Sequence, residues 1–121
     1  MDLNVLDLFC GAGGLSLGFK MEDYKIVGGI DFDQEAIDTH ALNFKEGQHL
    51  CCDISQFKDE EVLEKFEDVD IIIGGPPCQG FSMCGVRNIN DERNDLFYEY
   101  ARIVKMTNPY ILKFHLPLIC I

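Results

Sequence analysis

The chain has 121 residues, which allows at most one domain with a modest core. Hydrophobic residues make up 47% of it and charged residues 26%, a balance that is typical of a soluble globular protein and excludes a disordered one. Lysine and arginine number 10 against 21 aspartates and glutamates, and this net charge of −11 argues against tight nucleic-acid binding by this chain alone.

The amino-terminus and the cysteines predict a cytoplasmic protein. Met1–Asn4 lacks the basic and apolar regions of a signal peptide, and no stretch reaches the ~20 apolar residues of a membrane span. Without a secretion signal, the six cysteines at positions 10, 51, 52, 78, 84 and 120 are expected to be reduced thiols. No C-x-x-C pair occurs, so we predict no structural zinc and no other metal.

The first predicted elements are a strand, a glycine turn and a helix. Val5–Phe9 has the pattern of a buried strand, Cys10–Gly14 follows it directly, and apolar residues with helical spacing come behind Ser16. Glycines let a backbone approach a ligand, and a helix N-terminus offers N–H groups that have no partner within the helix. The pattern indicates a nucleotide-type binding loop, although a tight connection without a ligand fits it equally well.

The second predicted strand, Lys25–Ile30, ends at Asp31. This acid lies 18 positions after Gly13, close to the ~20 at which nucleotide-binding folds place the acid that binds ribose. A helix cap is the alternative role for Asp31, but Asp33 is better placed to cap the helix expected at Gln34–Phe44.

Two more elements are expected before the centre of the chain. Leu50–Asp53 has the pattern of a third strand with an acid at its end. Lys58–Phe66 has the pattern of a polar helix, and we expect it to present a solvated face.

The stretch Asp70–Ser82, with the sequence DIIIGGPPCQGFS, combines a strand with a stiff loop. Ile71–Ile73 is β-branched and ends in glycines, as a short buried strand does, and Pro76-Pro77 fixes φ at two successive positions. The loop carries one thiol, Cys78, at the carboxyl end of a strand, where open α/β sheets bind ligands. A stiffened loop is a poor place to bury a side chain, so we interpret Cys78 as reactive rather than as an inert buried cysteine.

The remaining elements complete an alternating pattern. Arg87–Arg93 is polar and is expected to be irregular and mobile, whereas Asp95–Met106 shows helical periodicity that Asn108-Pro109 ends. The apolar tail, residues 110–121, has the composition of a fifth strand, with Pro117 unsuited to the centre of a sheet. Alternating strands and helices predict an α/β fold with a Rossmann-like, doubly wound, mostly parallel sheet.

Together these motifs resemble those of the cytosine-5 DNA methyltransferase family. DLFCGAGG at Asp7–Gly14 resembles its first motif, and GGPPCQGFS at Gly74–Ser82 resembles its nucleophile motif. The resemblance implies S-adenosyl-L-methionine as cofactor, S-adenosyl-L-homocysteine as product and no metal. It implies that the cofactor is bound by Phe9, Gly11, Ala12, Gly13, Gly14, the acid–aromatic pair Asp31-Phe32, the adenine-edge pair Asp53-Ile54, Pro77 and Leu96.

The resemblance also implies the reaction. Carbon 5 of cytosine is a poor nucleophile, but addition of the Cys78 thiolate to carbon 6 turns the ring into an enamine whose carbon 5 attacks the methyl group. Loss of the carbon-5 proton and of the thiolate completes the cycle, and the base must leave the DNA stack to reach the thiol. The family's pattern places Pro77, Gln79, Gly80, Phe81 and Ser82 around that base.

The resemblance covers residues 1–109, the amino-terminal part of the catalytic domain, and stops in the tail 110–121. The Glu-Asn-Val motif, a later arginine motif and the basic target-recognition domain have no counterpart, and His115 stands where the glutamate is expected. A change of reading frame after Pro109 is one hypothesis for this departure. We expect a truncated chain that is inactive alone or depends on a second chain, with double-stranded DNA as substrate of the whole enzyme in a restriction-modification system. The incomplete sheet also favours self-association.

A non-catalytic fragment that binds S-adenosyl-L-methionine or a partner is the alternative function. Amino-methylating DNA enzymes follow the Pro-Pro pair with an aromatic residue, where this chain has Cys78. Zinc deaminases need a second cysteine two residues after the first and a His-x-Glu, whereas here the next cysteine after Cys78 is Cys84 and no His-x-Glu occurs. A transfer-RNA-methylating relative is disfavoured by Gly80-Phe81-Ser82.

Overall fold

The chain forms a parallel sheet between two layers of helices. The computed structural model describes residues 2–76, 92–109 and 111–114. Within these residues the elements are β1 (Asn4–Leu8), α1 (Gly14–Met21), β2 (Lys25–Asp31), α2 (Gln34–Asn43), β3 (Gln48–Cys51), the 3-10 helix η1 (Ile54–Gln56), α3 (Asp59–Lys65), β4 (Ile71–Gly74), α4 (Glu92–Thr107) and β5 (Ile111–Phe114).

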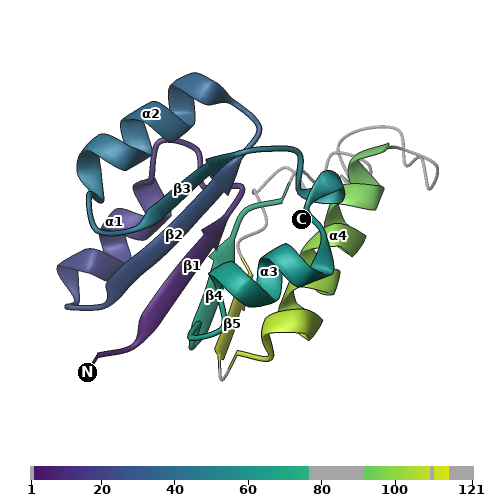
Figure 1. The fold of residues 1–121 in the computed structure, drawn as a ribbon. Helices are drawn as coiled ribbons and strands as arrows, with labels where there is room; N and C mark the ends of the chain where they lie inside the picture. The colour runs from purple at the N-terminus through teal and green to yellow at the C-terminus, as the bar shows by residue number, and fades with distance from the viewer. Residues whose placement is uncertain (1, 77–91, 110, 115–121) are drawn as a thin grey trace, which may run out of the picture.

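The strand order confirms the predicted doubly wound sheet. The order is β3-β2-β1-β4-β5, and each neighbouring pair is parallel. Helices α1 and α2 cover one face of the sheet, and α3 and α4 cover the other (Figure 1). The chain runs outward from β1 to β3 and then resumes at β4 on the other side of β1. This reversal between β1 and β4 marks the carboxyl edge of the sheet as the expected ligand site.

Both faces of the central strands are buried, as a parallel sheet requires. Leu6 and Ile72 pack in the apolar cluster beneath α3 and α4, whereas Val5, Ile71 and Ile73 pack toward α1. The prediction of a buried strand at Ile71–Ile73 is confirmed, because every residue of β4 is buried. The side chains in the middle of these strands are therefore closed to a ligand, which leaves the strand ends and the loops that follow them.

Some predicted boundaries are wrong. The third strand is Gln48–Cys51 rather than Leu50–Asp53, because the Asp53 side chain accepts a hydrogen bond from the Ser55 N–H and begins η1 instead. The last helix begins at Glu92, so its first turn takes in the end of the segment 87–93 that was expected to be irregular. The ends of helices and strands depend on local hydrogen bonds and caps, which hydrophobic periodicity does not detect.

Helix α3 presents the predicted solvated face and also packs one side on the core. It spans Asp59–Lys65, within a residue of the expected bounds, but Val62 is fully buried and the following Phe66 nearly so. The expected fifth strand exists as β5, which pairs with β4, and residues 115–121, with Pro117 and His115, lie outside the described residues. In the part of the chain that the structure describes, no helix has the length and apolarity to cross a membrane.

Candidate functional site

A pocket of about 260 Å³ opens at the carboxyl edge of the sheet. It is lined by Phe9 after β1, by Ile30, Asp31 and Phe32 at the end of β2, by Cys52, Asp53 and Ile54 after β3, and by Leu96 of α4. Six of these eight residues were singled out from the sequence, and Ile30 and Cys52 were not. The fold thus brings side chains separated by up to 87 positions, from Phe9 to Leu96, around one space.

Asp31 links the end of β2 to the glycine turn. Its Oδ2 accepts a hydrogen bond from the Gly11 N–H at 2.9 Å, and its Oδ1 accepts one from the Asp33 N–H at 3.0 Å. Each carboxylate oxygen has a second lone pair, so both oxygens can still accept a ligand hydroxyl. Asp33 caps α2 by accepting from the Glu35 N–H at 3.0 Å, which confirms the prediction that Asp33 rather than Asp31 is the cap.

The glycine turn, residues 10–14, lies next to the pocket but contributes little to its lining. Gly11 and Gly13 have φ values of 55° and 105°, a left-handed backbone that favours glycine. A Cβ at Gly13 would lie 2.5 Å from Phe44 Cε2 and 2.9 Å from His40 Cδ2, so no side chain fits there. Of the predicted Phe9–Gly14 segment only Phe9 lines the pocket; Gly11, Ala12 and Gly13 do not, and Gly14 lines a groove along α1 instead.

Phe9 and Phe32 offer two different aromatic surfaces. Phe9 has a φ of 56°, which is strained for a side chain other than glycine, and its ring stacks on that of Tyr100 at 6.4 Å between centroids. Phe32 is 68% exposed and lines the pocket. An exposed aromatic ring beside a pocket is suited to stacking on a planar ligand.

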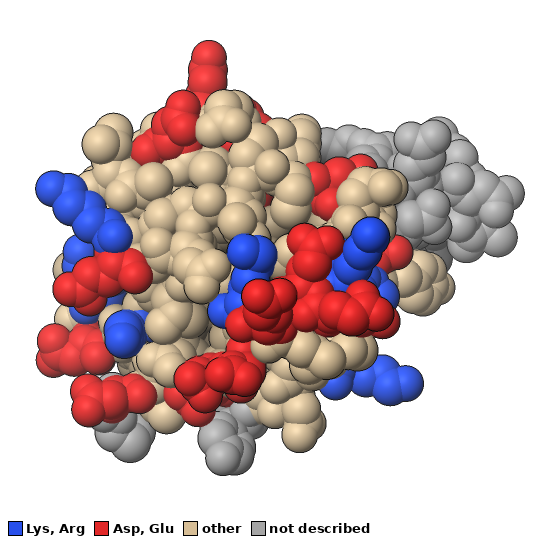
Figure 2. Space-filling model, viewed as in Figure 1, with Lys and Arg blue, Asp and Glu red and all other residues tan. Residues whose placement is uncertain are grey.

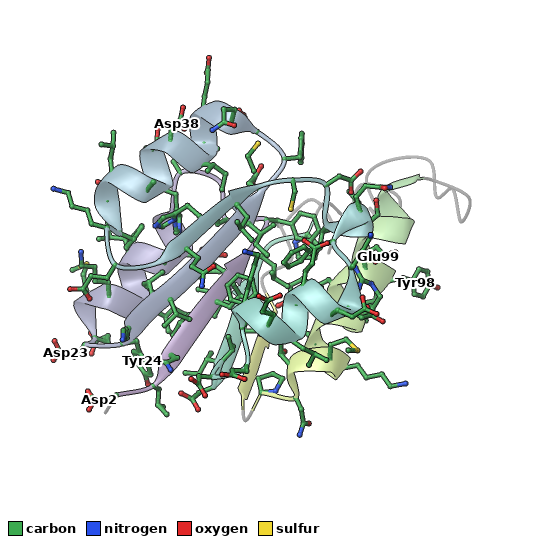
Figure 3. The ribbon with its side chains drawn as sticks, viewed as in Figure 1. Asp2, Asp23, Tyr24, Asp38, Tyr98 and Glu99 are labelled. Atoms are coloured by element: carbon green, nitrogen blue, oxygen red, sulfur yellow. The ribbon has the colours of Figure 1, made fainter. Side chains whose placement is uncertain are left out.

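Asp53 is held by a local hydrogen-bonded turn, and Ile54 is held from α4. The Asp53 Oδ1 accepts from the Ser55 N–H at 2.9 Å and from the Ser55 Oγ at 2.7 Å, which fixes the start of η1. The Arg102 Nη2 donates to the Ile54 carbonyl at 3.0 Å and to the Phe57 carbonyl at 2.7 Å. Figure 3 labels Glu99 on α4, and the Arg102 Nε donates to its Oε2 at 2.6 Å. Arg102 also pairs with Asp59.

Sequence reasoning missed this role of Arg102. Nothing in its neighbourhood in the sequence distinguishes it from an exposed helical arginine. The guanidinium side chain is 28% exposed and clamps η1 and α3 to α4. Its planar group with several donors can satisfy two carbonyls and two carboxylates at once.

The Cys10 and Cys52 thiols near this edge are neutral. Burial raises the pKa of Cys10, and the nearby carboxylates of Asp7 and Asp31 raise it further. Burial also raises the pKa of the Cys52 thiol, with Cys51 and Asp53 adding to the effect. Among the described residues, Cys10, Cys51 and Cys52 are free thiols. A neutral thiol at Cys52 lines the pocket as a small apolar group rather than as a nucleophile.

The predicted nucleophile and its loop lie outside the described residues. These are Pro77, Cys78, Gln79, Gly80, Phe81 and Ser82. The preceding Gly74 pairs with Leu8 in the β1–β4 ladder, so the chain leaves β4 at the edge where the pocket opens. A Cβ at Gly74 would lie 2.6 Å from the Leu8 carbonyl oxygen, so this exit needs glycine. In the ranges 2–76, 92–109 and 111–114 there is no group of histidine, cysteine and carboxylate side chains suited to a metal.

Comparisons with known proteins agree with this architecture. Residues 3–114 match the model of the family described as C-5 cytosine-specific DNA methylase. The chain is 41% identical over 114 residues to the Type II methyltransferase M1.HphI of Haemophilus parahaemolyticus, covering 90% of this chain and 31% of that protein. It is 42% identical over 107 residues to the Type II methyltransferase M.DdeI of Desulfomicrobium norvegicum, covering 88% and 26%.

A solved structure is also similar. It is a prophage-encoded protein of E. coli, assigned as a DNA modification methyltransferase, with a TM-score of 0.75 and 41% sequence identity. The match covers 89% of this chain and 30% of that one. The chain thus spans about a third or less of the length of these relatives.

Proposed function

Because the chain belongs to the C-5 cytosine-specific DNA methylase family, we propose that it is the part of a methyltransferase that binds S-adenosyl-L-methionine and carries the nucleophile for cytosine. The complete enzyme would transfer the methyl group to carbon 5 of cytosine in DNA. The observation that supports this most is the pocket at the carboxyl edge of the sheet, which six residues of the predicted cofactor set line together.

The pocket's residue types fit a nucleoside with a sulfonium side chain. Asp31 retains lone pairs for the two ribose hydroxyls, and the exposed Phe32 ring offers a stacking surface for adenine. Ile54 and Leu96 supply apolar walls, and Asp53 supplies an acceptor at the rim. When bound, the cofactor supplies an electrophilic methyl group. The residues of this chain bind it, orient it and exclude water from one side.

Cys78 is the proposed nucleophile. Its thiolate would form a bond to carbon 6 of the flipped cytosine, and the electron pair would move to carbon 5, which would take the methyl group and leave S-adenosyl-L-homocysteine. The carbon-5 proton then leaves and the sulfur–carbon bond breaks, which restores the ring double bond and the thiolate. Support for this role is the sequence motif and the exit of β4 beside the pocket.

DNA binding must depend on additional protein surface. Acidic side chains are spread over the face in Figure 2, and the lysines and arginines lie among them rather than in one patch. The net charge of −11 gives no general attraction to phosphate. We therefore propose that a second chain or further polypeptide supplies the basic surface and the target recognition.

Calorimetric titration of the chain with S-adenosyl-L-homocysteine tests the cofactor site. We expect saturable binding that Asp31→Ala abolishes, because two ribose hydroxyls lose their acceptor. Asp38→Ala is the matched control, since it removes the same charge from the outer side of α2 (Figure 3). Equal binding by all three proteins would refute the assignment of the pocket.

A covalent trap tests the chemistry separately. Duplex DNA with 5-fluorocytosine blocks loss of the carbon-5 substituent, so a cysteine that has added to carbon 6 stays attached. With S-adenosyl-L-methionine present, we expect an adduct that survives SDS and disappears in Cys78→Ala. If the chain needs a second polypeptide, the adduct appears only when that polypeptide is added. If the chain binds the cofactor but forms no adduct, either alone or with the second polypeptide, the result would favour a fragment that binds S-adenosyl-L-methionine without catalysis.

A further inference from the structure

A line of buried polar groups runs from β1 to the end of α2 behind the glycine turn. The Ser16 Oγ lies 2.6 Å from the Asp7 Oδ2 and 3.0 Å from the His40 Nε2. The His40 Nδ1 lies 2.9 Å from the His49 Nδ1, and the His49 Nε2 lies 2.6 Å from the Phe44 carbonyl oxygen. Asp7, Ser16 and His40 are essentially inaccessible to solvent, and His49 is half-buried.

His40 is the centre of this line and touches the turn directly. A Cβ at Gly13 would lie 2.9 Å from its Cδ2, and a Cβ at Gly29 would lie 2.6 Å from its Cε1. The imidazole therefore lies between the glycine turn and β2, with the absence of two side chains making room for it. Its ring orientation is fixed by hydrogen-bond partners on both nitrogens.

The number of hydrogens in this line can be counted. Four contacts connect Asp7, Ser16, His40, His49 and the Phe44 carbonyl, and each contact needs one hydrogen between its two atoms. A serine hydroxyl has one hydrogen to share, each neutral imidazole has one, and a carbonyl or an ionised carboxylate has none. That makes three hydrogens for four contacts. The line must hold one additional proton.

We propose that the additional proton resides on Asp7 and that the resulting one-directional hydrogen-bond chain positions the Gly13 turn for the cofactor. In this arrangement Asp7 donates to the Ser16 Oγ, Ser16 donates to the His40 Nε2, His40 donates from Nδ1 to His49, and His49 donates from Nε2 to the Phe44 carbonyl. Every contact then has a hydrogen, and no charge is buried. His40 acts as a positioning residue, and this part of the proposal rests on the proposed function.

The surroundings favour the neutral carboxyl over an ionised Asp7 paired with a charged His40. Burial raises the pKa of Asp7 to about 7, against the opposing effect of the Ser16 hydrogen bonds. Burial, with a smaller contribution from His49, lowers the pKa of His40 to about 4. The other titratable groups nearby are Asp31, the Cys10 thiol and, from α4, Tyr100. Asp31 raises the pKa of both Asp7 and His40.

Loss of the Asp7 proton would reverse the direction in which the hydrogen bonds of this line are donated. With Asp7 ionised, Ser16 donates to the carboxylate, so the His40 hydrogen must move to Nε2 and the His49 hydrogen to Nδ1. The His49 Nε2 lone pair then faces the Phe44 carbonyl oxygen without a hydrogen between them. The Phe44 ring and the His40 ring both lie against Gly13, so the broken contact involves the backbone of a residue whose side chain packs on the turn.

The decisive measurement is the tautomer of each histidine, read by nitrogen NMR on the chain labelled with 15N-histidine. Near pH 6 we expect two neutral imidazoles, with hydrogen on Nδ1 of His40 and on Nε2 of His49. Above about pH 7 the His40 hydrogen should move to Nε2. In Asp7→Asn the side-chain amide donates to Ser16 as the protonated acid does, so the first pattern should persist at high pH. A charged imidazole on His40 or His49 near pH 6, or a hydrogen on Nε2 of His40 there, overturns the assignment.

The positioning role is measured by titrating S-adenosyl-L-homocysteine into both proteins at low and high pH. The unaltered chain should lose about fivefold in affinity as the pH rises through about 7, the effect of one hydrogen bond, whereas Asp7→Asn should not. The same pH dependence in both proteins shows that the line is structural only and overturns the positioning role. If neither protein binds the probe at any pH, the proposed function fails, while the tautomers still decide the proton assignment.

Discussion

Replacing Asp7 with asparagine should stabilise the folded chain, although Asp7 is a fully buried residue with a 2.6 Å hydrogen bond. Most substitutions at such positions destabilise a protein. Here the folded state keeps the carboxyl neutral at pH values where the unfolded chain ionises it. Asparagine has nearly the same shape and offers an N–H where the protonated acid offers an O–H, so it retains the contact with Ser16 and removes the cost of keeping the acid neutral.

The magnitude follows from the pKa of Asp7, which rises from 3.8 to about 7 on folding. The folded state binds more protons between these values, so this acid lowers the free energy of unfolding progressively from about pH 4 to pH 7. At about 1.36 kcal/mol per pKa unit, the full effect above pH 7 is roughly 4 kcal/mol, and at pH 4.5 it is roughly 1 kcal/mol. We expect Asp7→Asn to gain about 2 to 4 kcal/mol near pH 8, since the new amide has its own desolvation cost.

His40 supplies an independent check on the sign. Its pKa falls from 6.5 to about 4 on folding, so the unfolded chain binds more protons over that window and stability rises with pH. In the unaltered chain the opposite slopes of Asp7 and His40 nearly cancel from about pH 4 to 6.5. In Asp7→Asn only the histidine slope remains, so its stability should increase by about 3 kcal/mol across the same range.

Equilibrium unfolding in urea, followed by circular dichroism at several pH values, measures both effects. Asp38→Asn on the exposed side of α2 is the control and should change the free energy of unfolding by less than about 0.5 kcal/mol. A destabilised Asp7→Asn chain near pH 8 would mean that folding does not raise the pKa of Asp7, so that the carboxyl is already ionised in the fold at lower pH. That result would contradict both the expected gain in stability and the proton assignment from which it follows.

Two further substitutions test cofactor binding and the stability of the fold independently. Phe32→Ala should weaken S-adenosyl-L-homocysteine binding about 5- to 100-fold by removing a stacking surface, with little change in the free energy of unfolding. Its control is Tyr98→Ala on α4, because Tyr98 is 67% exposed, like Phe32, but points away from the pocket (Figure 3). If both substitutions weaken binding to the same extent, Phe32 has no stacking role. Gly74→Ala should destabilise the chain by about 1 to 3 kcal/mol in chemical denaturation, since the new methyl would lie 2.6 Å from Leu8 O and Tyr100 Cε2. The control is Gly18→Ala, at an exposed position of α1 where no atom lies within 4 Å of the new methyl. This change should stabilise the chain by up to about 1 kcal/mol. Equal effects of the two substitutions on the free energy of unfolding would refute the close approach at β4.

The arrangement of the sheet could be predicted from the sequence because its signals are local. Ile71–Ile73 is apolar at every position, and helical spacing follows Ser16 and Asp95. Alternation of such segments along the chain leaves few topologies, of which the parallel doubly wound sheet is the commonest. Asp31 was found in the same way, because a strand end followed by an acid at a fixed spacing identifies the edge of that sheet.

The support of the site depended on contacts between residues far apart in the sequence. Arg102 holds the Ile54 carbonyl across 48 positions, and Ser16 meets His40 across 24. Neither partner has a pattern of its own, since an arginine on a helix and a histidine on a helix are ordinary residues. Whether such a side chain is solvated or buried in a network is decided by what packs over it, and periodicity in one segment carries no information about another.

The sequence alone thus determined which segments are strands and helices and which residues stand at the strand ends, since these follow from neighbours a few positions apart. Only the tertiary structure decided that Phe9, Asp31, Phe32, Asp53, Ile54 and Leu96 share one pocket while most of the glycine turn lies behind it. It also decided that Asp7, Ser16 and His40 are sealed from water in one line. The physical reason is that burial and hydrogen-bond pairing are properties of the packed chain, in which desolvation gives an ordinary aspartate and an ordinary histidine their altered pKa values.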